Sequence, residues 1–175
     1  NSKPYFVDHD VDLIFMGPTT ERFQKIIIEK LLPYKKRLIE LIENNVHFLI
    51  TGNAFELFGT KIIEEDGNEI PALDIFPFYS KQDLMHRFNS YVLADYNGYE
   101  FVGFKSQFTR VYPTSDLPVW LTLKRGIGFN KDLDPEGIKY YNFYGTHCLG
   151  PILVMNPIFT KAFLKDIGYK NEVIP

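Results

Sequence analysis

The residues of this sequence that could perform chemistry are few and scattered. Cys148 is the single cysteine, and it directly follows His147 in a run of aromatic and apolar residues. A cysteine nucleophile needs a base within hydrogen-bond reach, but neighbouring residues of a strand point to opposite faces. We therefore expect Cys148 to be a small buried hydrophobic residue and not a thiolate. His9, His47 and His86 lack the spacing and the company of metal ligands, so we expect neither a metal site nor another cofactor.

The elements that would position such residues begin with an apolar strand and a helix. Residues 11–16 (VDLIFM) predict a buried strand that stops at Gly17-Pro18. Residues 21–45 carry apolar side chains at helical spacing, with Thr19 or Thr20 as the cap, and Pro33 is expected to split or kink this helix.

A second strand leads into a sharp turn. Residues 46–51 (VHFLIT) form another apolar run, which Gly52-Asn53 interrupts. The following segment, AFELFG, predicts a helical turn that ends at Gly59. Residues 51–59 should therefore form a strand, a turn and a helix. Together with the preceding strand and helix, these elements predict a parallel sheet.

The second half of the sequence is rich in predicted strands and partly antiparallel. Its β-branched and aromatic runs are separated by Gly, Pro, Asn and Asp, and Asn97-Gly98 predicts a hairpin. The predicted strands cover residues 72–79, 91–94, 100–110, 119–124 and 140–148. A final helix should begin at Pro157 and stop at Gly168.

Composition narrows the classes of protein. The 175 residues, 45% hydrophobic and 23% charged, predict one folded domain over residues 1–175. The net charge of -3 leaves no positive field for nucleic acid, and no apolar run approaches the ~20 residues that span a bilayer. With one cysteine and no signal peptide, we expect a cytoplasmic protein. The aromatic share of 16% suits either a core or a partner surface.

Four segments, in order, resemble the CobB/CobQ-type class I glutamine amidotransferases, and most closely the glutaminase subunits that act on peptidoglycan precursors. DVDLIFMGPTTE stands where the family has a strand and a glycine-rich loop, and FLITGNAFELFG is similar to its nucleophile elbow. YEFVGFKSQFTRVY resembles the motif G-F-E-N-H-x-G-R-T, and YGTHCLGPILVMNPIFTKAFL resembles G-T-Y-L-H-G-P-L-L-x-x-N-P. Their order and spacing make the resemblance more specific than any single motif.

The resemblance implies a catalytic cysteine on the elbow and a catalytic histidine before the Gly-Pro pair. With Glu56 at the motif's Gln, the nucleophile position falls on Gly52, or on Thr51 or Asn53 if the register shifts by one. The histidine position falls on Leu149, which cannot take a proton. His147 lies two residues earlier, ~6.6 Å along an extended strand, which is too far to replace that histidine.

Two further departures concern the loops around the implied site. The resemblance implies that a glycine-rich loop supplies oxyanion contacts. Gly17-Pro18 replaces part of this loop here, and Pro18 has no backbone N–H to donate. Lys105-Ser106-Gln107 replaces the motif's Glu-Asn-His, whereas Arg110 matches its Arg. One interpretation is that these loops only connect strands to helices. The alternative is that they retain a pocket that binds a ligand without turnover.

The resemblance implies an α/β fold of the class I glutamine amidotransferase (flavodoxin-like) type, with a mainly parallel sheet flanked by helices and an antiparallel strand-rich half. We expect a catalytically degenerate protein that binds a small ligand in the old glutamine cleft, or that binds and regulates a Mur-ligase-like or cobyric-acid-type synthase. Cell-wall and cobalamin pathways share the motifs. The alternative is an active enzyme, a glutaminase or one of other chemistry, that uses Thr51, Asn53, Lys105 or Arg110.

The family's first strand-helix-strand unit has no counterpart here, since only about ten residues precede the first predicted strand. An open sheet edge at that position would favour a homo-oligomer or a partner.

Overall fold

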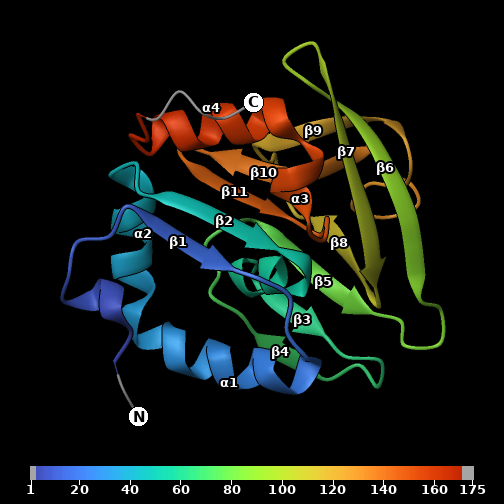
Figure 1. Cartoon of the computed structure of the whole chain (residues 1–175). Coiled ribbons are helices and arrows are strands. Elements are labelled where there is room, and N and C mark those ends of the chain that lie inside the picture. Colours follow the sequence, from blue (N-terminus) through green and yellow to red (C-terminus); the bar gives the residue numbers. More distant parts are fainter. Residues whose placement is uncertain (1–2, 171–175) are drawn as a thin grey trace.

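The computed structural model describes residues 3–170 as a mixed α/β fold with two sheets (Figure 1). Its helices are α1 (Glu21–Leu31), α2 (Lys35–Glu43), α3 (Ile152–Met155) and α4 (Pro157–Asp166). In Figure 1, α1 and α2 lie on one side of the larger sheet and α4 lies on the other. Helices thus flank the sheet, as the sequence predicts.

The larger sheet has seven strands and a mixed pattern of directions. In spatial order they are β1 (Leu13–Met16), β2 (His47–Thr51), β11 (Phe143–Thr146), β10 (Pro135–Tyr140), β9 (Val119–Arg125), β6 (Phe88–Tyr96) and β7 (Tyr99–Gln107). Only β1, β2 and β11 pair in parallel, and every other pairing in this sheet is antiparallel. The expectation of a mainly parallel sheet is therefore wrong, because hairpin connections in the second half extend the parallel part with antiparallel strands.

A second sheet of four strands packs beside the turn that follows β2. Its spatial order is β4 (Glu69–Pro71), β3 (Lys61–Ile63), β5 (Phe78–Gln82) and β8 (Thr109–Pro113). The predicted strand 100–110 is divided between the two sheets, since β7 ends at Gln107 and β8 begins at Thr109. Most of the predicted strand 72–79 is a loop, and β5 starts only at Phe78.

Local sequence signals account for the helix ends. The backbone N–H of Phe23 donates to Thr20 Oγ1 at 3.3 Å, so Thr20 caps α1. Pro33 lies in the short 3₁₀-helix η2 (Leu32–Tyr34) that separates α1 from α2, which confirms the expected split. Pro157 opens α4, and Gly168 follows its end at φ +99°.

Aromatic side chains fill the interior. Phe143 packs against Phe48, Phe58 and Phe76 in one core cluster. In a second cluster Trp120 packs against several rings, which include Phe101, Tyr144 and Phe159. Many of the aromatic side chains thus lie in the core, whereas others, such as Phe15 and Tyr91, are exposed.

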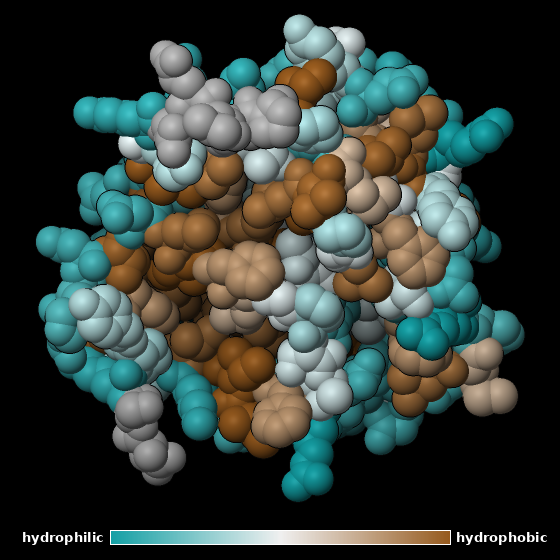
Figure 2. All heavy atoms as spheres, in the orientation of Figure 1, coloured by the Kyte–Doolittle hydropathy of each residue, from teal (hydrophilic) through white to brown (hydrophobic). Residues whose placement is uncertain are grey.

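One edge of the larger sheet presents apolar side chains to solvent. Strand β1 is an edge strand, and Leu13 and Phe15 on it are 40% and 63% exposed. In Figure 2 apolar side chains gather over the centre of the visible face, where Figure 1 shows β1. A partner or second copy at this edge stays a prediction. Among residues 3–170, no helix is long and apolar enough to cross a membrane.

Candidate functional site

The turn after β2 has the shape of an elbow that presents one residue. All five residues of β2 are buried, and the chain then enters the 3₁₀-helix η3 (Gly52–Phe58). Gly52, the first residue after the strand, adopts φ +63°, in the left-handed region that favours glycine. Enzymes that display a nucleophile on a strained strand-to-helix turn use this geometry. Here the predicted strand-turn-helix is confirmed, but its presented residue has no side chain.

A cleft of about 250 Å³ opens beside Gly52. We call it the elbow cleft. Its lining comes from the loop between β1 and α1 with the first residues of α1, from the elbow, from Arg87 just before β6, from the end of β7 with the start of β8, and from the segment after β11. Because β1, β2 and β11 are parallel neighbours, three of these segments leave the sheet at the same carboxyl edge. Open α/β sheets bind their ligands at this edge.

The elbow cleft gathers most, but not all, of the residues expected at the implied site. Those that line it are Pro18, Gly52, Asn53, Glu56, Ser106, Gln107 and Leu149. Gly17 and Thr51 are neighbours in sequence of lining residues but do not line the cleft themselves.

Lys105 and Arg110 lie elsewhere. Lys105 is fully buried and its Nζ lies 2.5 Å from Glu136 Oε2, so it faces the interior. Arg110 lines a separate polar groove, where its Nη1 lies 3.6 Å from Asp83 Oδ2. The ion pair with Glu136 and the hydrogen bond to Gly128 O hold the Lys105 ammonium in the interior. Neither cation is placed to act in the elbow cleft.

Apolar groups close the space above Gly52. A Cβ atom at this position would lie 2.7 Å from Pro18 Cβ and 3.0 Å from Leu149 Cδ2. Leu149 is held there by its backbone N–H, which donates to Phe104 O at 2.8 Å. Gly52 and Leu149 therefore meet in one cleft, as the resemblance implies. Neither residue, nor Pro18, offers a nucleophile, a base or a hydrogen-bond donor from its side chain.

Asn53 fastens the elbow to the β1–α1 loop. Its side-chain oxygen accepts from the Thr19 N–H at 2.8 Å, and its Nδ2 donates to Thr19 O at 2.7 Å. The Thr19 N–H is therefore already engaged, and Pro18 has none. This loop has no free amide at either residue to stabilise an oxyanion.

A buried polar cluster forms the floor of the elbow cleft. Glu56 accepts hydrogen bonds from Gln24 Nε2, at 3.0 Å, and from Thr109 Oγ1. His147 Nε2 lies 3.1 Å from Glu56 Oε1, and both side chains are fully buried. An ionised carboxylate only accepts, so this contact places a ring proton on Nε2, and Nδ1 is an acceptor only while the ring carries that one proton. Two polar atoms of the lining, His147 Nδ1 and Gln107 Oε1, have no protein partner.

The sequence interpretation missed this cluster. Strand geometry argues against His147 as a replacement for position 149 and as a base for Cys148, and no pattern suggests Glu56 as its partner. The two residues are 91 positions apart and carry no local pattern that joins them. Arg87, which also lines the elbow cleft and stacks over the Phe108 ring at 5.2 Å, was missed for the same reason.

Burial and nearby charges shift the pKa values of Glu136 and Cys148 in opposite directions. Burial favours a higher pKa for Glu136, but Lys105 and His147 and the hydrogen bonds from Lys105 and Thr146 outweigh it, so its pKa lies below the ordinary value. Burial raises the pKa of Cys148 to about 12, so the thiol is protonated at neutral pH. Among residues 3–170, no group of three or more His, Cys, Asp or Glu side chains is placed to hold a metal ion.

An elbow at the carboxyl edge of parallel strands, with a cleft beside it, defines the class of site that nucleophile-dependent α/β enzymes use. No protein-family model matches the chain. The chain is 30% identical over 156 residues to "Lipid II isoglutaminyl synthase (glutamine-hydrolyzing) subunit GatD" of Staphylococcus aureus strain N315, covering 89% of this chain and 63% of the relative. It is 26% identical over 170 residues to the protein of the same name from Streptococcus pneumoniae strain R6, covering 93% of this chain and 65% of the relative.

The chain thus spans somewhat less than two thirds of the length of these relatives. A solved structure of PurLQS from Thermotoga maritima aligns over 81% of this chain and 71% of the matched chain, with 12% identity and a TM-score of 0.49. The similarity to glutaminase subunits that the motifs indicate is therefore found over most of the chain, whereas the loss of activity and the pathway stay predictions.

Proposed function

We propose that this protein is similar to glutamine amidotransferases in fold and site but does not hydrolyse glutamine, and that its elbow cleft binds a ligand without turnover. One observation carries the proposal. Gly52, at the presenting position of the elbow, is closed in by Pro18 Cβ and Leu149 Cδ2, at 2.7 and 3.0 Å from where a Cβ would lie. The hydrolysis of an amide through a covalent intermediate needs a nucleophile and a base at this place.

The names of the relatives suggest a partner for this chain. Their printed name describes a glutamine-hydrolysing subunit of a synthase, so we propose a synthase subunit of the Mur-ligase-like type as the partner of this chain. A flavodoxin-like arrangement within a single cytoplasmic domain is part of the same proposal. In such a complex a non-hydrolysing subunit would bind or regulate the synthase.

The polar floor of the elbow cleft supports ligand binding. The two unpartnered atoms are Gln107 Oε1, which accepts hydrogen bonds, and His147 Nδ1, which accepts one in the neutral ring. Leaving buried acceptors without donors costs about 1–3 kcal/mol each. A ligand that brings N–H groups would satisfy them, and Arg87 adds a positive charge at the lining.

The same cluster favours a second candidate function. A histidine that lines a cleft, with one ring nitrogen on a buried carboxylate and the other without a protein partner, can act as a general base on water. In this alternative His147 and Glu56 would support a slow hydrolysis that does not use the elbow residue. The earlier alternative, based on Thr51, Asn53, Lys105 or Arg110, has less support, because the Asn53 amide and the Lys105 ammonium are engaged elsewhere and Arg110 lies in another groove.

Glutamine hydrolysis by the purified protein tests the proposal. We expect no release of glutamate and ammonia above background, alone or with a candidate synthase subunit, and no covalent labelling by a glutamine-mimicking diazo ketone. GatD of Staphylococcus aureus, assayed in parallel with its own synthase, is the positive control. Ammonia release that persists in Cys148→Ala and is lost in His147→Gln would favour the second candidate. Release that Cys148→Ala abolishes would contradict both.

A further inference from the structure

A second hollow, separate from the elbow cleft, lies between α2 and the loop before β5. It has a volume of about 260 Å³ and shares no lining residue with the elbow cleft. We call it the α2 pocket. Its lining includes Ile39, Ile42, Glu43, Ile75, Phe76 and Tyr140.

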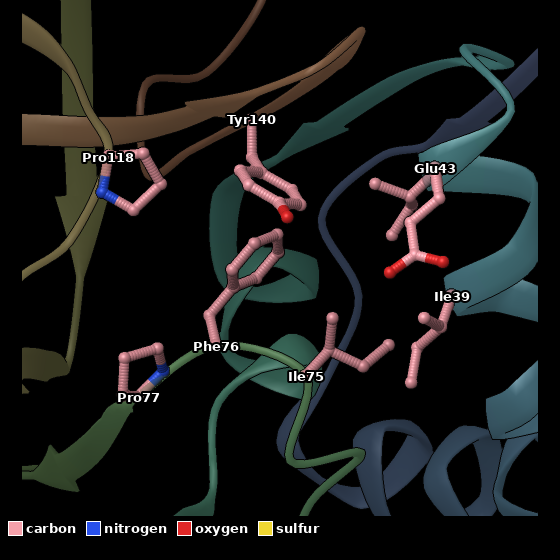
Figure 3. A pocket seen from close by; sticks show the side chains of 8 residues that line it. Ile39, Glu43, Ile75, Phe76, Pro77, Pro118 and Tyr140 are labelled. Carbon is pink, nitrogen blue, oxygen red and sulfur yellow. The ribbon is translucent and has the colours of Figure 1, made fainter.

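Most of the α2 pocket is apolar. Three isoleucines form one wall, and the rings of Phe76 and Tyr140, whose centroids lie 6.0 Å apart in an edge-to-face arrangement, form the other. In Figure 3 these two rings lie between Ile39 and Ile75 on one side and Pro77 and Pro118 on the other. Neither proline has a backbone N–H, so neither can bind an anion through the main chain. The lining therefore suits an apolar group and offers little to a negative one.

Glu43 is the only charged side chain of the α2 pocket, and it belongs to the last turn of α2. No ion pair joins it to a Lys or Arg side chain within residues 3–170, whereas the nearby Lys35 and Arg37 are paired with Asp74 and Glu40. Figure 3 shows its carboxylate on the same side as the isoleucines, directed toward the hollow. Burial, Tyr141 and Glu43 raise the pKa of Tyr140, which keeps that hydroxyl neutral at physiological pH.

A carboxylate beside two aromatic rings attracts cations. The face of an aromatic ring carries partial negative charge and attracts a positive group that lies over it. An ammonium whose alkyl body fills the hollow would contact the isoleucines and place its charge beside Glu43. At about 260 Å³ the hollow is near the lower end of ligand sites, which run from roughly 300 to 1,000 Å³, so the occupant is small.

We propose that the α2 pocket binds a small organic cation with an apolar body, whose positive group lies between the Glu43 carboxylate and the rings of Phe76 and Tyr140. The α2 pocket shares no lining residue with the elbow cleft, so binding of a cation there does not depend on whether the protein hydrolyses glutamine.

The probe for the test is hexyltrimethylammonium, used below its micelle-forming concentration, with hexanol as the neutral and hexanoate as the anionic comparison. Binding is followed by NMR of protein labelled at the isoleucine methyl groups, which places the probe at Ile39, Ile42 and Ile75. We expect these three methyl signals to shift, with the cation binding about fivefold or more tightly than hexanol, the gain of one favourable ion pair or cation–π contact. Hexanoate should bind more weakly than hexanol.

Two matched variants separate charge selection from simple apolar binding. Glu43→Gln keeps the shape of an exposed side chain, so the protein should fold, and it should lower the affinity for the cation severalfold, toward that for hexanol, while the contact with the rings remains. Glu40→Gln makes the same change on the same helix outside the α2 pocket, and it should change the affinity less than twofold. The proposal is wrong if the three methyl signals do not respond to the cation, if hexanol binds as tightly, or if both variants behave alike.

Discussion

Gly52 is suited to its position by both its backbone and its surroundings. The left-handed conformation costs a residue with a Cβ about 1–2 kcal/mol, and Gly52 adopts φ +63°. Pro18 and Leu149 also occupy the space that a side chain would need. In enzymes with an elbow, the strained residue carries the reactive atom. Here the strain is relieved by glycine, and the reactive atom is absent.

Replacing Gly52 by alanine should therefore cost more stability than the backbone conformation alone explains. We expect Gly52→Ala to lower the free energy of unfolding by roughly 2–4 kcal/mol, the sum of left-handed strain and overpacking. Gly67→Ala is the matched control, because Gly67 has φ +88° with no atom within 4 Å of its Cβ position. It should lose only about 1 kcal/mol. Urea denaturation of both variants measures the difference, and equal losses would mean that Pro18 and Leu149 do not close over Gly52.

Cys148 should be unreactive in the folded protein. It is fully buried, and burial raises the pKa of its thiol to about 12. Because the thiolate is the form that reacts, iodoacetamide should leave native protein unmodified and alkylate it completely in urea. Intact-mass spectrometry reads this directly, since the chain has one cysteine. Rapid alkylation of native protein would show an accessible thiolate and would return Cys148 to the candidate nucleophiles.

At the scale of elements, a buried ion pair joins the strands behind the elbow cleft. Lys105 of β7 donates to Glu136 of β10 and, at 2.6 Å, to Gly128 O in the loop before β10. Glu136 also accepts from Thr146 Oγ1 of β11 at 2.8 Å and from the His147 N–H at 2.9 Å. Breaking such a pair from one side costs about 3–5 kcal/mol, because a buried charge is left alone. The pair therefore fixes how the antiparallel strands meet the segment that carries His147.

This pair should make stability depend on acidity. The folded-state pKa of Glu136 lies below its ordinary value of 4.5, so the ionised carboxylate stabilises the fold above that pH. The contribution is lost as the pH falls from 4.5 through the lower folded-state value. We expect Glu136→Gln to be less stable than the unchanged protein at pH 7 and to show a weaker loss of stability on acidification.

Urea unfolding at neutral and acidic pH measures this dependence. Glu69→Gln serves as the control, because Glu69 is paired with Lys61 at 2.6 Å on the surface, where ion pairs contribute about 0–1 kcal/mol. Its acid dependence should match that of the unchanged protein. An unaltered acid dependence in Glu136→Gln would contradict the assignment of that dependence to the buried pair.

On the scale of the whole molecule, the three positions that the resemblance assigns to catalysis in the elbow cleft come from segments that are distant in the chain. Pro18 follows β1, Gly52 follows β2 and Leu149 follows β11, and the parallel pairing of these strands brings their ends to one edge. Each segment departs separately from what amide hydrolysis requires. Restoring the chemistry therefore requires changes in all three.

The triple variant Pro18→Gly, Gly52→Cys, Leu149→His should gain covalent labelling by the diazo ketone at position 52. Pro18→Gly opens the space for the cysteine and supplies a backbone N–H. The double variant that keeps Pro18 should label far more slowly, since loss of one oxyanion donor costs about 10²–10³ in rate. Peptide mapping by mass spectrometry measures the label. A folded triple variant that labels no faster than the unchanged protein would contradict the assignment of position 52 to the nucleophile.

Local patterns in the sequence determined much of the framework. The apolar run before Gly52-Asn53 predicted the elbow, Thr20 and Pro33 predicted the start and the break of the first helix, and the ordered motifs predicted that Gly52 and Leu149 meet. The elbow and the helix signals hold because capping, proline geometry and strand burial act between residues close in sequence, whereas the meeting of Gly52 and Leu149 followed from the resemblance to a known family.

Tertiary structure alone decided the order of the strands and the contents of the cleft. Asn97-Gly98 predicted the antiparallel hairpin of β6 and β7, but the order of strands depends on which elements pair, so β9 and β10 could not be placed between this hairpin and the parallel strands from periodicity. The 91-residue separation of His147 and Glu56 is closed only by the pairing of β2 with β11, and the ion pair with Glu136 holds Lys105 in the interior. A hydrogen bond between distant residues depends on packing that no local pattern records, and for that reason the polar floor of the elbow cleft became visible only in three dimensions.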